Sequence, residues 1–465
     1  MARKVSIDIS VRSFITAVAV IFGLMVISYV LTFVIPSGEY ARTINEAGNT
    51  IIDTQAGFKY TEGGLPFWKW ILSPFLVLAA NGSGTLIAII IFLLVIGGAF
   101  TCLDKSGILN YMLELISHRY GSRRYTLMTV VTLIFMMLGA LVGSFEEVVP
   151  MVPIVVALAV SLGWDELTGM AMSLLAVGCG FASGVLNPFT VGVAQSLAEL
   201  PMFSGVWLRA VSFCLIFPLL LFFIRSHAKK IEKPLEETSA YLEFKHDDKL
   251  SRALLTFAVI LGIGILFILC STFISALQDF TMIAVALMFL VAGISSPLIT
   301  GMKIGELMKH FGKGVVAIFP AVLMILMAAS IRYTLEEAKI LDTILHGAVG
   351  FADSLPKWAV ILFIYLIVLG MNFFIGSGSA KAFMLIPLIV PLAQIFGISS
   401  QLCIVAFAFG DGFSNVIYPT NAALLIALGL ADINYAKWFR WTIKFQVANL
   451  ALTSAILLFG LAVGY

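Results

Sequence analysis

The sequence is poor in charge. Asp, Glu, Lys and Arg make up only 12% of its 465 residues, whereas apolar residues make up 60%. A soluble chain of this length could not bury so much apolar surface. Several apolar stretches reach the roughly 20 residues that a helix needs to cross a bilayer. We therefore expect an all-α polytopic membrane protein in contact with lipid. The net charge of +2 comes from basic residues scattered between the spans and predicts no nucleic-acid partner.

Paired cysteines and catalytic motifs are also absent from the sequence. The five cysteines are isolated in apolar segments without a CxxC pair, so neither a disulfide framework nor a zinc site is predicted. There is no HExxH motif and no serine nucleophile elbow, so we expect neither an enzyme nor a bound cofactor. The histidines fall in a polar linker or at expected membrane interfaces, where solvated roles are expected. No small-residue cleavage site follows MARKVSIDISVRSF, so the first apolar run predicts a retained span.

The apolar runs between charges predict about nine full spans. They lie near residues 14–35, 86–103, 166–199, 207–224, 253–274, 280–299, 315–331, 402–425 and 441–463. Two further runs, 125–162 and 358–395, are each interrupted in the middle, by GSFEE and by GSGSAK. Each half has about 15 to 18 residues, which is marginal for a crossing. We interpret both runs as re-entrant hairpins, because non-helical backbone at that depth requires protein or water around it.

The distribution of basic residues predicts the orientation. With a cytoplasmic N-terminus, cytoplasmic segments hold 20 of the 28 Lys and Arg residues, seven of them in the mixed-charge linker 225–252. The C-terminus is then extracellular or periplasmic, and so is the glycine-containing loop 36–64, whose TIIDTQ stretch could pair as a β-hairpin. Segments 104–118 and 336–352 have apolar residues at helical spacing and predict amphipathic helices in the interface.

The two halves of the chain, 1–224 and 253–465, resemble each other. Trp207-Leu208-Arg209 recurs 231 residues later as Trp438-Phe439-Arg440, and Val-Leu-Asn-Pro at 185–188 recurs as Val-Ile-Tyr-Pro at 416–419. An odd number of crossings separates equivalent points, which predicts inverted repeats; a parallel arrangement would require one miscounted span. Inverted repeats with broken helices are typical of secondary transporters, whose site lies near the midplane between the repeats.

Four discontinuities should converge at that site. They are the two hairpin tips and the breaks SGVLNPFT (183–190) and GDGFSNVIYPTN (410–421), where glycine and proline free backbone groups to act as ligands. The expected substrate ligands are Ser144, Glu146, Glu147, Asn187, Ser377, Ser379, Lys381, Asp411, Asn415, Thr420 and Asn421. Thr190 belongs to the same group of neutral ligands. Gly143, Ser183, Gly376 and Ser414 are expected to coordinate a cation, with Na⁺ as the metal if one is bound.

Charge is the strongest guide to the substrate. Glu147 and Lys381 occupy equivalent positions in the two tips, and counting Glu146, Glu147 and Asp411 against Lys381 gives a formal charge of −2. This balance favours a cationic or zwitterionic substrate, or bound cations. Three alternatives stay open: a structural Glu147–Lys381 bridge, an Asp411 that only caps its helix break, and a Glu146 that points to solvent.

The motifs GSFEE, GFASGVLNPFTVGVAQ, NFFIGSGSAKA and FAFGDGFSNVIYPTNAAL resemble those of the YfcC branch of the DcuC-type carriers, in the ion-transporter superfamily. The resemblance covers essentially the whole chain. It implies a bacterial inner-membrane carrier, a homodimer, and elevator-like movement of the hairpin-bearing part. Members are labelled both as four-carbon dicarboxylate carriers and as basic amino acid antiporters. The Ser-Asn-Thr tips of the superfamily's sodium-dicarboxylate carriers are replaced here by GSFEE and GSGSAK.

We therefore expect a secondary active transporter of small amino acids, of the arginine or ornithine type. It would work by exchange or by coupling to Na⁺ or protons. Glu146, Glu147 and Asp411 would face the cation, and Lys381 together with helix N-termini would hold the α-carboxylate. A four-carbon dicarboxylate carrier is the first alternative. A channel is the second, although it would not need two occluding hairpins.

Overall fold

The computed structural model describes most of the chain. The described residues are 11–44, 50–52, 57–80, 83–120, 123–143, 145–201, 203–233, 246–271, 280–352 and 355–465. Ser144, at the first hairpin tip, lies outside them, as do residues 234–245 of the linker.

Helices dominate the described residues, as the apolar runs predict. The first half contains α1 (Val11–Val34), α2 (Phe67–Leu76), α3 (Ser83–Lys105), α4 (Ile108–Tyr120), α5 (Arg124–Met137), α6 (Val152–Ser161), α7 (Glu166–Met170), α8 (Ala176–Ser183), α9 (Val193–Leu197) and α10 (Val206–Ile231). The second contains α11 (Asp248–Ser271), α13 (Thr281–Ile299), α14 (Ile304–Glu337), α15 (Leu341–Ala352), α16 (Lys357–Asn372), α17 (Gly378–Ile395), α18 (Ser400–Ser414), α19 (Ala422–Leu430) and α20 (Tyr435–Ala462). Seven helices of the described part are long and apolar enough to cross a membrane. The protein is an all-α polytopic membrane protein.

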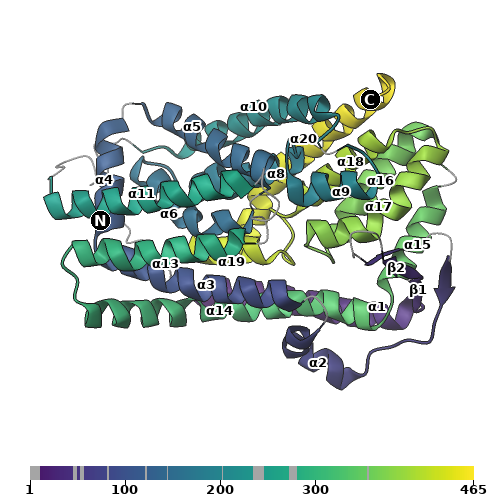
Figure 1. Ribbon diagram of the computed structural model, residues 1–465, viewed down its shortest axis with the longest axis horizontal. Helices are drawn as coiled ribbons and strands as arrows, with labels where there is room; N and C mark the ends of the chain where they lie inside the picture. The colour runs from purple at the N-terminus through teal and green to yellow at the C-terminus, as the bar shows by residue number, and fades with distance from the viewer. Residues whose placement is uncertain are drawn as a thin grey trace.

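Four long helices pack side by side along one edge of the molecule (Figure 1). They are α1, α3, α13 and α14, and small residues let their backbones approach closely. A Cβ added to Gly314 would lie 2.2 Å from the carbonyl oxygen of Gly97, and one added to Gly293 would lie 2.6 Å from Cα of Ala99. Substitution at either glycine would therefore push these helices apart.

The two interrupted runs enter the molecule from opposite ends. In Figure 1, α5 and α6 lie toward the left end beside α4, and α16 and α17 lie toward the right end beside α15. The first run does not form two plain helices. After α5 come the π-helical turn η3 (Leu138–Val142) and a 3-10 segment, η4 (Glu146–Met151). Pro150 lies in η4, and Pro153 lies in the first turn of α6, where proline is tolerated because an N–H there would have no partner inside the helix.

The broken helices lie between the two hairpins. The first runs through α7, η5 (Ala171–Leu175) and α8, stops at Gly184 with φ +54°, and resumes in η6 (Pro188–Gly192) and α9. The second stops after α18 and resumes in α19, which Asn421 caps. The halves before the breaks, α8 and α18, pack together, and a Cβ added to Gly412 would lie 2.3 Å from Cα of Ala182.

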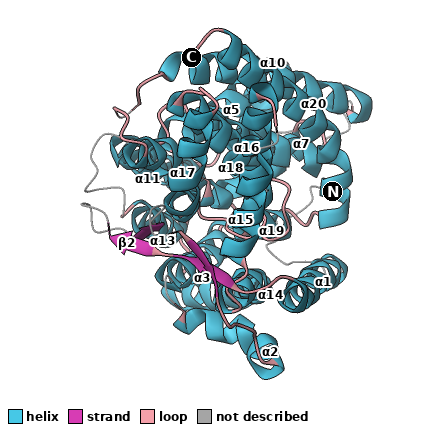
Figure 2. Ribbon diagram, turned by 90° about the vertical axis from the view of Figure 1, so that its right-hand side faces the viewer, coloured by secondary structure: helices cyan, strands magenta, loops and turns pink. Residues whose placement is uncertain are grey.

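The loop between α1 and α2, residues 36–64, contains four short strands beside α15, drawn in magenta in Figure 2. β1 (Gly38–Tyr40) pairs antiparallel with β4 (Phe58–Tyr60), and β2 (Arg42–Ile44) pairs with β3 (Thr50–Ile52). The first three residues of the TIIDTQ stretch therefore pair with β2 as a hairpin would, and residues 53–55 lie outside the described part of the chain. The pattern did not predict α2, which follows this loop and contains Pro74.

Candidate functional site

The second hairpin and the second broken helix meet at a buried ion pair. The Nζ of Lys381, in the first turns of α17, is bound by Oδ1 of Asp411 on α18 and by Oδ1 of Asn372 at the end of α16. Neither side chain of the ion pair is exposed to solvent. The tip between α16 and α17 is short, and this brings Asn372 and Lys381 next to each other across it.

Asn372 connects this pair to the second helix break. Its Nδ2 lies 3.0 Å from the Asp411 carbonyl oxygen, 2.6 Å from Ser414 Oγ and 2.9 Å from Asn415 Oδ1. Asn415 Oδ1 also accepts a bond of 3.1 Å from Asn421 Nδ2, and Asn421 Oδ1 caps α19 through the Leu424 N–H. A continuous polar network therefore joins the hairpin to both sides of the break.

The tip of the first hairpin contacts the break in the first broken helix. Gly143 has φ +75°, and a Cβ there would lie 2.2 Å from Oδ1 of Asn187. That amide oxygen also accepts a bond of 3.3 Å from the Thr190 N–H. Only glycine allows the tip to approach the amide so closely, so the sequence GSFEE begins with the residue that the contact requires.

The two glutamates follow directly at this tip. Glu147 is 8% exposed and Glu146 is partly exposed. Glu146 is close enough to interact electrostatically with Glu147 and with Asp411, so the acidic groups of both halves share one region. A carboxylate at such depth in a bilayer costs at least about 2.5–3.5 kcal/mol, which points to a cationic counterpart.

The two halves also touch directly at Gly378, in the second tip. A Cβ added to Gly378 would lie 2.6 Å from Cγ2 of Thr190, in the first broken helix, and 2.7 Å from Oδ2 of Asp411. Thr190 and Asp411 are both fully buried. Within the described residues, neither Thr190 Oγ1 nor Asp411 Oδ2 has a hydrogen-bond partner.

The remaining predicted residues have more local roles. The hydroxyls of Ser183 and Ser414 donate to carbonyls within their own helices, at 2.6 and 2.8 Å. Ser377 caps α17 and lies 3.4 Å, hydroxyl to hydroxyl, from Ser379. Gly376 is exposed and Thr420 is partly buried. The expected assignment of Lys381 to a substrate carboxylate thus competes with its pairing to Asp411, a partner that the repeat alignment did not indicate.

Sequence reasoning missed Asn372 altogether. The feature of the sequence that could have indicated it is a polar amide side chain within the apolar run 358–375, nine residues before Lys381. It also missed how the breaks are supported by the helices that follow them. Arg209 Nη2 lies 3.5 Å from the Val185 carbonyl oxygen, and Trp438 Nε1 donates to the carbonyl of Val416, the equivalent of Val185, at 2.8 Å.

One histidine differs from the expectation of a solvated role. His227, on α10, is 19% exposed and bridges two elements. Trp441 Nε1 donates to its Nδ1 at 3.0 Å, so Nε2 carries the proton and donates to Asp165 Oδ2, also at 3.0 Å. Burial by itself raises the pKa of Asp165, but the bonds from His227 and from Thr168 together hold that pKa below its usual value.

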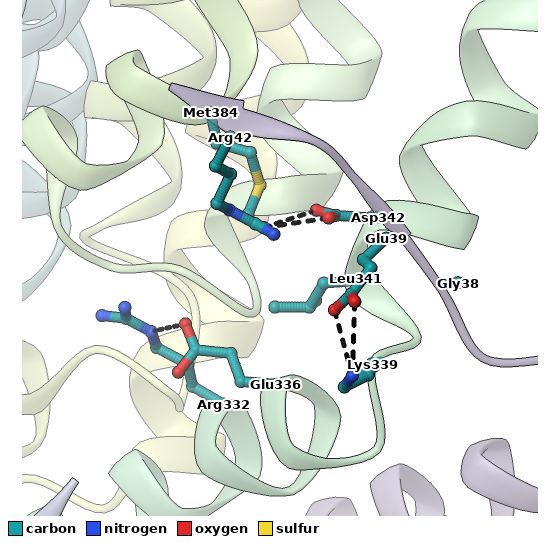
Figure 3. A pocket seen from close by; sticks show the side chains of 9 residues that line it. All are labelled: Gly38, Glu39, Arg42, Arg332, Glu336, Lys339, Leu341, Asp342 and Met384. Carbon is teal, nitrogen blue, oxygen red and sulfur yellow. Dashed lines mark hydrogen bonds and ion pairs between the residues drawn. The ribbon is translucent and has the colours of Figure 1, made fainter. Parts of the chain in front are cut away.

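A separate pocket of about 310 Å³ lies beside the loop between α1 and α2 (Figure 3). Three ion pairs line it: Arg42–Asp342, Arg332–Glu336 and Lys339–Glu39. Asp342 is 4% exposed and also accepts a bond from the Tyr40 N–H. Burial and the charge of Asp342 raise the pKa of the Tyr40 hydroxyl to about 12. Met384 of α17 also lines the pocket, which therefore borders the second hairpin but shares no lining residue with the Lys381 network.

Hairpins that approach from opposite ends, with broken helices and buried charges between them, define a membrane transport protein. The chain belongs to the DcuC family, described as C4-dicarboxylate anaerobic carrier, whose profile matches residues 14–462.

Two curated proteins are similar to this chain. One, from Escherichia coli (strain K12), is named "Putative basic amino acid antiporter YfcC"; it is 31% identical over 380 residues, which cover 77% of this chain and 74% of the relative. The other is an uncharacterized protein of Haemophilus influenzae, 23% identical, with 96% of each chain covered.

Two solved transporter structures are similar as well. The YdaH transporter of Alcanivorax borkumensis has a TM-score of 0.45 at 18% identity, with 97% of this chain and 99% of that chain covered. MtrF of Neisseria gonorrhoeae, from a class of antimetabolite efflux pumps, has a TM-score of 0.47 at 16% identity, with 95% and 94% covered.

Proposed function

We propose that the protein is a secondary active transporter of small amino acids, of the basic arginine or ornithine type. Exchange or cation coupling would drive it, with elevator-like movement of the hairpin-bearing part. The name of the Escherichia coli relative supports the substrate class. The observation that carries the proposal is the ion pair between Lys381 and Asp411. Lys381 is the one basic residue in the sequences of the two tips, 143–147 and 376–381. Its pairing with Asp411 therefore leaves the formal negative charges of Glu146 and Glu147 to attract a cationic substrate.

A four-carbon dicarboxylate carrier is the second candidate. The family description and the N-terminus of α17, whose first N–H groups suit a carboxylate, favour it. A dicarboxylate, however, would enter a region that already holds Glu146, Glu147 and Asp411. Its two negative charges would be repelled by three carboxylates, with only Lys381 to compensate.

The remaining parts of the proposal concern the setting of the carrier. The 231-residue offset and the similar support of both breaks favour two inverted repeats. The basic linker favours a cytoplasmic N-terminus and a periplasmic C-terminus in a bacterial inner membrane. The coupling cation would be Na⁺ or a proton, and the carrier would function as a homodimer.

Counterflow into proteoliposomes tests the substrate class. Vesicles loaded with unlabelled arginine should accumulate labelled arginine, and external ornithine and lysine should compete, whereas neutral amino acids, succinate and fumarate should not. Glu147→Gln should abolish this exchange while the protein stays folded and inserted. Glu337→Gln is the matched control, because Glu337 is 40% exposed and pairs with Lys69 of α2.

Three results would contradict the proposal in different ways. Exchange of succinate or fumarate without exchange of arginine would establish the dicarboxylate alternative. Uptake that never saturates and shows no counterflow would indicate a channel. Full exchange by Glu147→Gln would remove that carboxylate from the transport mechanism.

A further inference from the structure

Two buried oxygen atoms at the junction of the two halves have no hydrogen-bond partner among the residues that the structure describes. Among the described residues, Asp411 Oδ2 and Thr190 Oγ1 have no hydrogen-bond partner, although both side chains are fully buried. An ionised carboxylate can only accept hydrogen bonds, and leaving one of its buried oxygens unpaired is costly. The chemistry of this junction therefore requires a donor, and a positively charged donor fits it best.

Lys381 does not donate to Asp411 Oδ2. Lys381 Nζ binds the other carboxylate oxygen, Oδ1, and Asn372 uses its Nδ2 protons on the Asp411 carbonyl, Ser414 and Asn415. Oδ2 instead faces Gly378, where an added Cβ would lie 2.7 Å from it and 2.6 Å from Cγ2 of Thr190. The φ of Gly378 is not positive, so the position requires glycine for space rather than for backbone conformation.

A second, complementary group lies next to these oxygens. Gly378 and Ser379 are the first residues of α17, an 18-residue helix, and their N–H groups cannot have partners inside the helix. They carry the positive end of the helix dipole and suit a carboxylate. The residues just before them, Gly376 and Ser377, are exposed, so this helix end is open to a ligand.

We propose that this junction recognises the backbone of an α-amino acid. Asp411 Oδ2 and Thr190 Oγ1 accept hydrogen bonds from the α-ammonium, and the N–H groups of Gly378 and Ser379 donate to the α-carboxylate. Gly378 acts as a specificity-determining residue, because a Cβ there would collide with Thr190 Cγ2 and Asp411 Oδ2 and would displace the two oxygens that accept the ammonium. This assignment rests on the proposed amino acid transport and leaves Glu146 and Glu147 to face the cationic side chain.

The assignment also changes the role of Lys381. Because Asp411 and Asn372 hold its ammonium, Lys381 neutralises part of the negative charge of the site and orients the carboxylate of Asp411. The N-terminal end of α17 binds the α-carboxylate of the substrate. Because Thr190 belongs to the first half and Asp411 and Gly378 to the second, the amino group would be bound only when both halves are in contact. Binding of the backbone would thereby hold the two halves together.

The test compares three ligands as competitors of labelled arginine in counterflow: arginine, 5-guanidinopentanoate, which lacks the α-ammonium, and agmatine, which lacks the α-carboxylate. The wild-type protein should prefer arginine over 5-guanidinopentanoate by about tenfold or more, the loss expected for removing a charged group that is hydrogen-bonded. Thr190→Val and Gly378→Ala should shrink that preference by weakening arginine alone. The preference for arginine over agmatine should persist in Thr190→Val.

Matched control variants distinguish a local effect from general damage. Thr442→Val removes a buried, unpartnered hydroxyl on α20, and Gly370→Ala adds a methyl group that meets nothing within 4 Å on α16. Both should keep the wild-type preference. Thermal unfolding of each purified variant shows whether it is folded. The comparison of the three ligands on the wild-type protein tests the proposal even where a variant does not fold.

The outcomes are distinguishable. If the wild-type protein does not exchange arginine at all, the proposed function fails and the assignment fails with it. If arginine is exchanged but 5-guanidinopentanoate competes equally, only the assignment is overturned. The same holds if folded Thr190→Val and Gly378→Ala both keep the full wild-type preference.

Discussion

The ammonium of Lys381 and the carboxylate of Asp411 form an ion pair that is sealed from solvent, between the tip of one hairpin and the middle of a broken helix. The two residues lie on α17 and α18, which are consecutive helices. Removing one partner of a buried pair leaves an uncompensated charge, whereas removing both can be nearly neutral.

This pair predicts non-additive stability effects. Lys381→Met or Asp411→Asn alone should lower the free energy of unfolding by about 3–5 kcal/mol, and the double variant should recover most of that loss. Denaturant unfolding in detergent measures both quantities. The control pair is Arg332–Glu336, in which both side chains are 38% exposed and whose coupling should stay below about 1 kcal/mol. Additive losses at positions 381 and 411 would contradict the pairing.

The sequence predicted the parts of this site that follow from local chemistry. Glycine and proline marked both breaks, and the glycine-rich tips marked both hairpins, because those residues interrupt helices wherever they occur. Glu146, Glu147, Lys381 and Asp411 were expected together because charge is rare in this chain.

The contacts between elements could not be predicted in the same way. The repeat alignment relates Glu147 to Lys381 by position, but position in a repeat does not decide which side chains touch. The pairing of Lys381 with Asp411 depends on how α17 packs against α18, and the role of Asn372 depends on the same packing. The helix α2 was missed because Pro74 and its short length are equally typical of a loop.

The contacts of the loop between α1 and α2 predict a local effect on stability. Asp342 holds the loop through the Tyr40 N–H and two bonds from Arg42. Asp342→Ala should therefore weaken the docking of strands β1 and β2 on α15. The free energy that holds the loop in its docked position should fall by about 1–3 kcal/mol. Limited proteolysis should cut the loop faster in this variant. Glu39→Ala removes an exposed pair with Lys339 and should leave the rate of cleavage nearly unchanged; equal acceleration by both variants would argue against an anchoring role for Asp342.

The bridge between Asp165 and His227 predicts a pH dependence. Because the pKa of Asp165 is lowered in the folded protein, its carboxylate contributes stability above the unfolded pKa of about 3.9, and that contribution is lost as the pH falls through the folded pKa. Asp165→Asn should cost about 1–2 kcal/mol at pH 7 and progressively less below about pH 4. Thermal unfolding of both proteins between pH 7 and pH 3 measures the difference. A gap that does not narrow toward acid would exclude the carboxylate charge as its cause.

The orientation of the carrier is testable by labelling single cysteines in intact cells. The basic linker predicts that Lys230→Cys reacts with an impermeant maleimide only after permeabilisation, whereas Lys59→Cys, on the exposed strand β4, reacts at once. The background must lack Cys102, Cys179, Cys214, Cys270 and Cys403, of which three are buried and call for replacement by alanine.

The same labelling experiment decides from which side each hairpin enters. The strands and the second hairpin lie toward the same end of the molecule, opposite the first hairpin (Figure 1). If position 59 faces outward, the Gly376–Lys381 tip is reached from outside and the Glu146–Glu147 tip from the cytoplasm. Labelling of position 230 but not of position 59 in intact cells would invert both assignments, and with them the direction in which substrate first meets Asp411.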